Sequence, residues 1–156
     1  MAAKHGGWVL DLVDSTTTPL DNKGERSVSN MNLRDGRLTV STMMPSSNPC
    51  EYGGAGWIMI IDAATGGAYL GGGVTDVNND DEINDEDMVD TDGDGTDDSH
   101  VAGVQVDGGF TQTTTGVDTG DGTVLNVFNE SDGDIGTTLS VGNELLDKRL
   151  NWRELR

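Results

Sequence analysis

The stretch at residues 76–98, DVNNDDEINDEDMVDTDGDGTDD, carries twelve carboxylates in 23 positions and contains no Lys or Arg. Side chains of like charge at this density repel one another, and an ionised carboxylate loses hydration energy when it is buried without a partner. The segment therefore stays in water or is neutralised by bound cations. Metal binding and folding are therefore expected to be coupled.

The overall composition predicts one modest β-rich domain. The chain has 156 residues, of which 33% are hydrophobic, 4% are aromatic and 23 are glycine. Frequent Gly, Thr and Ser with little Leu or Ala favour strands and turns over helices. The formal net charge of -19 repels phosphate backbones and anionic lipid headgroups, so nucleic acid is not an expected partner.

The N-terminal sequence MAAKHGGWVLDL lacks the basic region, the apolar run and the cleavage site of a secretory signal peptide. No stretch approaches the roughly 20 apolar residues of a membrane span. Two interpretations remain open: a cytosolic protein, or the tail of a longer exported chain, which the composition favours. Cys50 is the one cysteine, so it cannot form a disulfide within the chain. We expect it to be a buried thiol; the alternative is that its disulfide partner is located elsewhere in a parent chain.

Short runs of alternating or apolar residues predict strands joined by tight turns. The strongest signal is a hairpin over residues 27–44 with Asp35-Gly36 as its turn. Further strands are predicted at 7–13, 57–62, 69–70, 101–109 and 123–141, the last folding back at 131–134. Residues 144–156 form an amphipathic helical turn or a last strand, and Trp152 and Leu155 suggest docking onto an apolar surface.

Hairpin-connected short strands are typical of β-propeller blades, which need roughly 40 to 50 residues each. At that size the 156 residues would make two to three blades of antiparallel strands. We therefore predict an all-β fold, a partial β-propeller. Residues 1–156 would be a single propeller fragment interrupted by the acidic calcium-binding insertion at 76–98.

The acidic stretch fits two calcium loops. Calcium takes six to eight oxygen ligands, and an EF-hand loop supplies them from positions 1, 3, 5, 7, 9 and 12. Counting from residue 76 places Asp81 at position 6, where glycine is expected, so the turn should be strained; the residue at position 12 is Asp instead of Glu. Counting from residue 90 places Gly95 correctly at position 6 and ends after nine residues. The predicted ligands are Asp76, Asn78, Asp80, the Glu82 carbonyl, Asn84 and Asp87 in the first loop, and Asp90, Asp92, Asp94, the Thr96 carbonyl and Asp98 in the second.

Other chemistry has less support in the residues. Acidic runs are often simply solvated, but random acids would not keep Asp or Asn on alternate positions with Gly at the expected offset. Mg²⁺ is disfavoured because it rarely uses cages made only of protein. His100 is interpreted as an ordinary polar residue and not as a transition-metal ligand. No nucleophile elbow, phosphate loop or HExxH motif occurs, so we expect no enzyme.

Several segments together resemble a known family. They are GWVLDL (7–12), the stretch GERSVSNMNLRDGRLTVSTMMPSSNPCEYGGAGWIMIIDAATGG (24–67) and the terminal NWREL (151–155). These resemble the C-terminal propeller region of the PilC/PilY family of type IV pilus biogenesis factors and tip-associated adhesins. The resemblance implies an exported, cell-surface protein at the pilus tip whose partners are minor pilins or the remainder of a longer tip protein.

In that family, a calcium loop of the form D-x-[DN]-x-[DN]-x-x-x-D on a propeller blade is linked to control of pilus extension and retraction, and to adhesion. Asp90, Asp92, Asp94 and Asp98 match that form, and the loop from residue 76 matches it with Asn84 at the last place. Two further interpretations stay open. One is a dockerin-like calcium-dependent adaptor, which needs two loop-helix repeats; the other is a blade fragment of a quinoprotein-type enzyme.

Overall fold

The computed structural model describes residues 6–13, 22–34, 36–48, 50, 54–69, 75–78, 80–90, 92–106, 108–109, 114–120 and 122–142. Within these residues the protein is all-β and its strands pair antiparallel. The prediction of an all-β chain is confirmed. The sheets do not close into a ring, and a propeller is not shown.

The first sheet contains five strands. They are β1 (Arg26–Ser27), β2 (Asn32–Arg34), β3 (Arg37–Met43), β4 (Gly56–Asp62) and β7 (Gly103–Val106), in the order β1-β3-β4-β7 with β2 also paired to β3. Arg34 stands opposite Arg37, so a two-residue turn joins β2 to β3, and Gly36 supplies its positive φ of 78°. The predicted hairpin is confirmed, although residues 28–31 interrupt its first arm.

The second sheet has three strands in the order β10-β9-β8: β8 (Thr114–Asp118), β9 (Thr123–Asn129) and β10 (Ile135–Val141). The β9–β10 hairpin turns at 130–134, as predicted, where the Glu130 amide donates to the Asp134 carbonyl at 2.9 Å. Strand β8 was not predicted, because in TTGVD only Val117 is apolar and the run carries no alternating signal.

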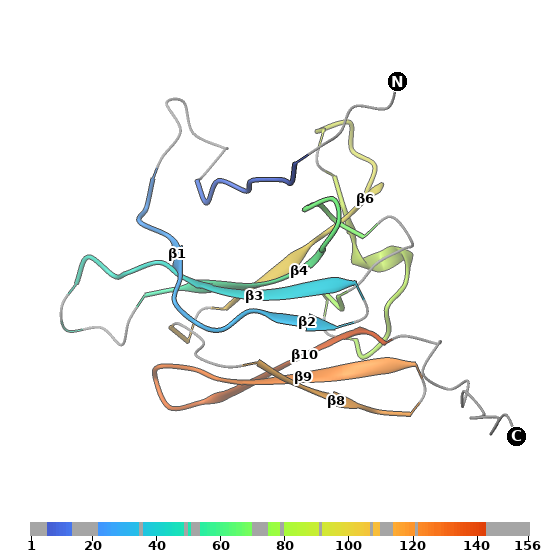
Figure 1. The fold of residues 1–156 in the computed structure, drawn as a ribbon. Coiled ribbons are helices and arrows are strands. Elements are labelled where there is room, and N and C mark those ends of the chain that lie inside the picture. Colours follow the sequence, from blue (N-terminus) through green and yellow to red (C-terminus); the bar gives the residue numbers. More distant parts are fainter. Residues whose placement is uncertain are drawn as a thin grey trace, which may run out of the picture.

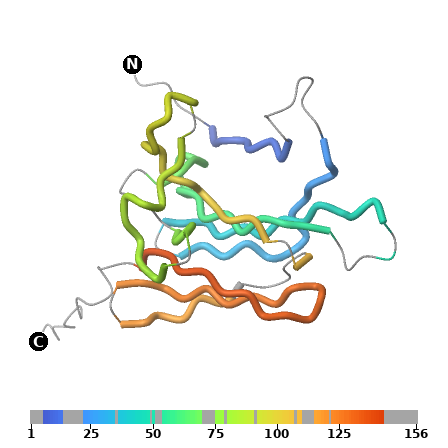
Figure 2. The backbone as a smooth tube through the Cα atoms, turned by 180° about the vertical axis from the view of Figure 1, so that it is seen from behind, coloured from blue at the N-terminus to red at the C-terminus, as the bar shows by residue number. Residues whose placement is uncertain are grey.

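The two sheets lie one above the other (Figure 1). Ile58 of β4 and Val106 of β7 pack against Phe128 of β9, and this cluster forms the apolar core between the layers. Residues 6–13 run along the other side of the first sheet, away from residues 114–142 (Figure 2). The fold is therefore a two-layer β structure with a short N-terminal segment as an added cover.

The strand predicted at residues 7–13 is wrong: the structure shows irregular backbone there. A strand needs a neighbour to take its N–H and C=O groups, and this segment is held instead by a side chain. The Trp8 indole Nε1 donates to the Ala63 carbonyl at 3.0 Å, while Val9 remains 89% exposed. Trp8 therefore ties this segment to the chain just after β4 without adding a strand to the sheet.

The expectation that Cys50 is a buried thiol is also wrong, because the side chain is exposed. It lies in the turn-rich segment between β3 and β4, where its amide donates to Asn48 Oδ1 at 3.1 Å. A surface connection between two strands offers no apolar site for the sulfur. The predictions for residue 70 and for residues 144–156 fall outside the described residues, and Tyr69 is not in a strand.

Candidate metal centre

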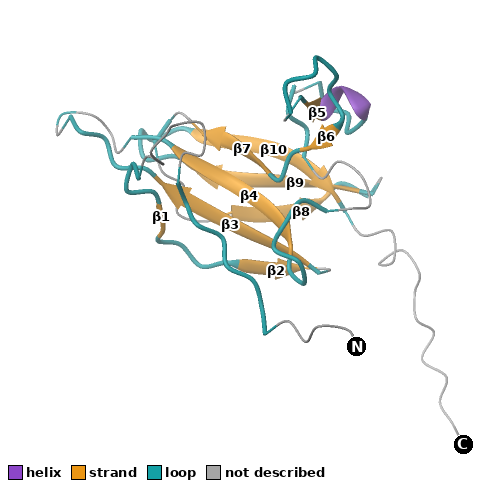
Figure 3. Ribbon diagram, turned by 90° about the horizontal axis from the view of Figure 1, so that it is seen from above, coloured by secondary structure: helices purple, strands orange, loops and turns teal. Residues whose placement is uncertain are grey.

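The acidic segment lies between β4 and β7, two strands of the first sheet, and its start is bridged to the second sheet. Thr75 forms an isolated bridge with Ser140 of β10, and the Asp76 amide donates to the Leu139 carbonyl at 3.2 Å. The segment then passes through a single 3₁₀ turn, η1 (Asp85–Asp87), and a small hairpin of β5 (Met88–Val89) and β6 (Ser99–His100), before it enters β7. Figure 3 shows this hairpin and η1 beyond one end of the sheets. Sheet edges thus fix both ends of the acidic segment.

The first loop is organised by its own acidic and amide side chains. Asp76 Oδ2 accepts from the Asp81 amide at 3.1 Å, Asn78 Oδ1 from the Asp80 amide at 2.9 Å, and Asp80 Oδ1 from the Glu82 amide at 2.8 Å. In loop numbering these bonds join position 1 to 6, 3 to 5, and 5 to 7. Alternate side chains therefore turn inward and bind the backbone that curls around them.

The second loop repeats this pattern from residue 90. Asp90 Oδ2 accepts from the Gly95 amide at 2.8 Å, Asp92 Oδ1 from the Asp94 amide at 3.1 Å, and Asp94 Oδ1 from the Thr96 amide at 2.8 Å. Asp90 Oδ1 also accepts from the Gly93 amide at 2.6 Å. The bonds again join positions 1 to 6, 3 to 5, and 5 to 7, so the two registers predicted from spacing correspond to two loops of like construction.

The two loops differ at position 6. Gly95 has a φ of 89°, a left-handed angle that costs glycine little, whereas Asp81 has a φ of 67°. A residue with a Cβ loses roughly 1–2 kcal/mol in this region, less for Asp or Asn, whose side chains bond locally. Among the residues that the structure describes, Asp81 is the one non-glycine with positive φ. The strain expected from its sequence position is present.

Asp90, Asp92 and Asp94 form an exposed cluster that could hold a metal ion. Each offers a carboxylate oxygen, and these oxygens lie within 4.8 Å of one another. Hydrogen bonds from the amides of Gly95 and Gly93 lower the pKa of Asp90, outweighing the opposite effect of burial. Asp90 therefore stays ionised under mildly acidic conditions, as a hard cation requires of a ligand.

The other predicted ligands differ from one another in burial and in hydrogen-bond partners. In the first loop, Asp76 is buried, and Asn84 Oδ1 caps η1 by accepting from the Glu86 amide at 2.6 Å. In the second loop, Asp98 Oδ1 accepts from the Ser99 hydroxyl at 3.1 Å. The roles predicted for the carbonyls of Glu82 and Thr96 remain predictions. Within the described chain, the acidic group that gathers three ligand oxygens lies in the second loop.

Asp87 has a role that the spacing did not predict. It is only 1% exposed, and its two oxygens accept from the amides of Val77 at 2.7 Å, Asn78 at 3.4 Å and Asn84 at 3.0 Å. Asn84 and Asp87 also form a capping box around η1. Asn is a preferred residue at a helix N-cap, so the sequence contained part of this information.

Comparison with known proteins gives one partial match. Over 70 residues, 44% of this chain, it is 44% identical to a protein of Xylella fastidiosa (strain Temecula1) described as a type IV pilus biogenesis factor PilY1 homolog. The match covers 4% of that protein, so the chain spans a small part of this relative. No protein-family model matches the chain, and no solved structure matches it. At the level of sequence, the chain is similar in part to a PilY1 homolog.

Proposed function

We propose that this chain is a calcium-binding module of a protein that acts in type IV pilus biogenesis. The observation that carries the proposal is the second acidic loop, where Asp90, Asp92 and Asp94 bring carboxylate oxygens within 4.8 Å of one another. Three exposed carboxylates at such distances repel each other, and a bound divalent cation removes that repulsion. Without a counter-ion, repulsion among these ordered carboxylates destabilises the loop, and a bound cation would remove that cost.

Calcium suits this loop better than other metals. The ligand groups are carboxylates and carbonyls, which are hard oxygen donors, and calcium accepts six to eight of them in variable geometry. Asp90, Asp92, Asp94, the Thr96 carbonyl and Asp98 would supply five ligand positions, with water completing the shell. The first loop is the weaker candidate, because Asp87 is buried and its two oxygens accept from three backbone amides.

The similarity to a PilY1 homolog supports the pilus assignment. The module would act outside the cell, at the pilus, and would contact minor pilins or the remainder of a longer pilus-tip protein. It has no catalytic step in this proposal. The described part of the chain contains no helix that is long and apolar enough to cross a membrane.

The mechanism proposed for the module involves only the acidic loops and the strands next to them. Ca²⁺ would neutralise and order residues 90–98, which lie between β5 and β6. Because β6 leads into β7 of the first sheet and the start of the first loop is bridged to β10 of the second, cation binding would fix a segment that touches both sheets. The surface presented to a pilin would then depend on calcium concentration, which would bear on pilus extension, retraction and adhesion.

Isothermal titration of the purified chain with Ca²⁺ tests the binding half of this proposal. Asp92→Asn should weaken binding about tenfold or more, since it removes one charge from the ligand set. Asp85→Asn is the matched control, because it removes the same charge from the exposed surface of η1. Equal losses in both variants would mean that only the overall charge attracts calcium, and would contradict a specific site.

Detection of the protein in pilus preparations tests the assignment to pilus biogenesis independently of calcium binding. Antibody against the chain should label sheared pilus fractions from the source organism, and deletion of its gene should reduce the number of surface pili. Normal piliation in the deletion strain, with the protein absent from the fractions, would contradict the assignment while leaving calcium binding intact.

A dockerin-like adaptor gains no support from the fold. That class needs a helix after each calcium loop, and the described residues after the second loop form β6 and β7. The helical structure between the loops is the single turn η1.

A further inference from the structure

The space between the sheets is divided into an apolar half and a polar half. Ile58, Val106 and Phe128 fill the side under β4 and β7. Under β2 and β3 the sheets are separated by a cavity of about 70 Å³. Its polar lining comes from both layers: Asn32, Arg34, Arg37, Thr39, Asn126 and Ser140. A water needs about 10–15 Å³ of such volume, so the cavity admits a group of several heavy atoms.

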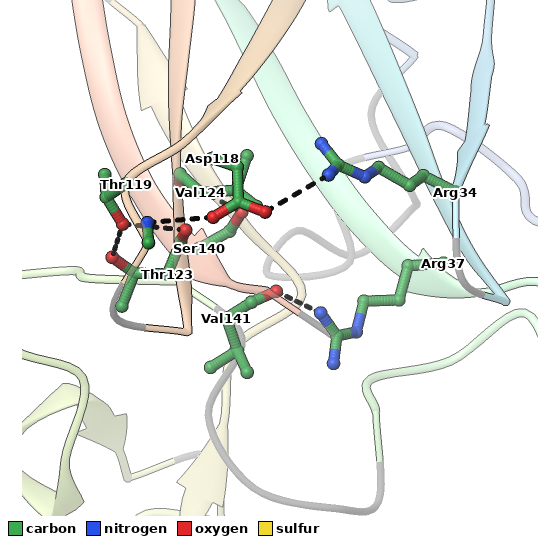
Figure 4. A network of polar contacts seen from close by, with 9 residues as sticks. Arg34, Arg37, Asp118, Thr119, Thr123, Val124, Ser140 and Val141 are labelled. Atoms are coloured by element: carbon green, nitrogen blue, oxygen red, sulfur yellow. Dashed lines mark hydrogen bonds and ion pairs between the residues drawn. The ribbon is translucent and has the colours of Figure 1, made fainter. Parts of the chain in front are cut away.

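Two guanidinium groups reach into this space (Figure 4). Arg34 and Arg37 are directly opposite each other across the β2–β3 pair, and like charges in that position are destabilising. Arg34 is paired with Asp118 of β8 at a loose 3.8 Å, and both side chains are about half exposed, at 40% and 55%. Arg34 and Arg37 therefore bring two guanidinium groups to the lining of one cavity.

Arg37 is only partly satisfied. One terminal nitrogen donates to the Val141 carbonyl across the cavity, and its guanidinium lies 4.9 Å from the centre of the Tyr69 ring. Its Nε is buried and has no hydrogen-bond partner. Asp62, opposite Arg37 in β4, is engaged by the amides of Ala64 and Thr65. A buried, unpaired donor on a cation is costly, and an oxygen acceptor in the cavity would remove that cost.

We propose that this cavity is a binding site for a single compact carboxylate group. A carboxylate fits the planar fork of Arg and can accept from Arg37 Nε and from Arg34 at once. The protein's charge of -19 disfavours a multivalent anion such as phosphate more strongly than a singly charged one. Gly116 of β8 lines the cavity, and a Cβ there would come within 2.8 Å of Val124. The site is distinct from the acidic loops and does not depend on calcium.

Acetate is the probe for this site. In the full chain, titration with sodium acetate, followed by the NMR signal of Arg37 Nε–H, should give a saturable downfield shift as the new hydrogen bond forms. Sodium chloride at matched ionic strength should not reproduce it. A linear response, or an equal response to chloride, would show only general screening and would overturn the proposal. Phosphate binding more tightly than acetate would overturn the assignment to a carboxylate.

Three variants sharpen the test. Arg37→Gln should weaken acetate binding about tenfold, the value of a charge-assisted hydrogen bond. Asp118→Asn removes the competing carboxylate and should strengthen binding about twofold to fivefold, and since Asp118 is exposed this variant should fold even if the first does not. Arg26→Gln is the control, because Arg26 is an exposed β1 cation bonded to Gly24. Unchanged affinity in Asp118→Asn would contradict the site, as would an equal loss in Arg26→Gln.

Discussion

The carboxylate of Asp87 accepts a hydrogen bond from the backbone amide of Val77 at 2.7 Å, ten positions earlier in the chain. This contact closes the first acidic loop without a metal ion. Position 12 of a calcium loop normally turns its carboxylate to the ion. Here the side chain is buried and serves three amides, so it acts as a structural anchor between the first loop and η1.

Replacing this anchor should destabilise the fold. In Asp87→Asn, an NH₂ group replaces one carboxylate oxygen. This NH₂ group would face a backbone N–H in a buried position, which should lower the free energy of unfolding by about 2 kcal/mol. Urea denaturation should show a lower midpoint at an unchanged slope. Asp85→Asn, on the exposed side of the same turn, should leave the midpoint in place, and a matching loss there would indicate that η1 responds only to charge.

The strained position in the first loop should accept glycine. Asp81 has a φ of 67°, so Asp81→Gly relieves up to about 1 kcal/mol of backbone strain, partly offset by the entropy of the unfolded chain. We expect a small gain in thermal stability. The comparison is Asp97→Gly, which adds the same entropy cost where no positive φ is relieved. A loss of stability in Asp81→Gly comparable with that in Asp97→Gly would contradict the strain.

Packing between the sheets should depend on Phe128. The side chain is 5% exposed and contacts the cluster of Ile58 and Val106, so Phe128→Ala should cost about 3–5 kcal/mol. Val117→Ala is the control, because Val117 is 52% exposed on the neighbouring strand. Chemical denaturation of both variants measures the difference. Equal stability would mean that the two layers do not share a core.

The Asp90 carboxyl should stay ionised below the ordinary pKa of aspartate. Hydrogen bonds from Gly95 and Gly93 lower the pKa of Asp90 in the folded protein, so this carboxylate favours the fold above its unfolded pKa, and the contribution disappears as pH falls through the lowered value. Carbon-detected NMR should show the Asp90 carboxyl titrating below 3.8, the ordinary value. Titration at or above that value would contradict the hydrogen-bonded loop.

Local patterns predicted the parts of the fold that local chemistry determines. Asp35-Gly36 and residues 131–134 marked both hairpin turns, since a positive φ and side-chain bonds to turn amides leave direct traces in sequence. The apolar run at 57–62 marked β4 because it is covered on both faces. The stacking of two sheets, and β8, depended on contacts between distant residues that periodicity does not encode.

The candidate site was predictable in its spacing but less so in its roles. Alternate Asp and Asn residues lie in two loops where their side chains accept from loop amides, and Gly95 marked the position that needs a left-handed angle. Their role as calcium ligands stays a prediction. Burial separates Asp87, which is enclosed with its three amides, from the exposed acids that could reach a cation, and spacing carries no burial information. For that reason Asp87 was predicted as a ligand and is found bonded to three amides.

The central claim is that the second loop binds calcium through its carboxylates, and the amides of Gly93 and Gly95 report on it most directly. Both donate to Asp90, so Ca²⁺ binding should shift these two NMR signals at micromolar to submillimolar calcium, with saturation at one ion for this loop. Asp90→Asn should abolish the response, while Mg²⁺ at the same concentration should produce little change. Gly93 and Gly95 signals that stay fixed up to several millimolar Ca²⁺ would contradict the account.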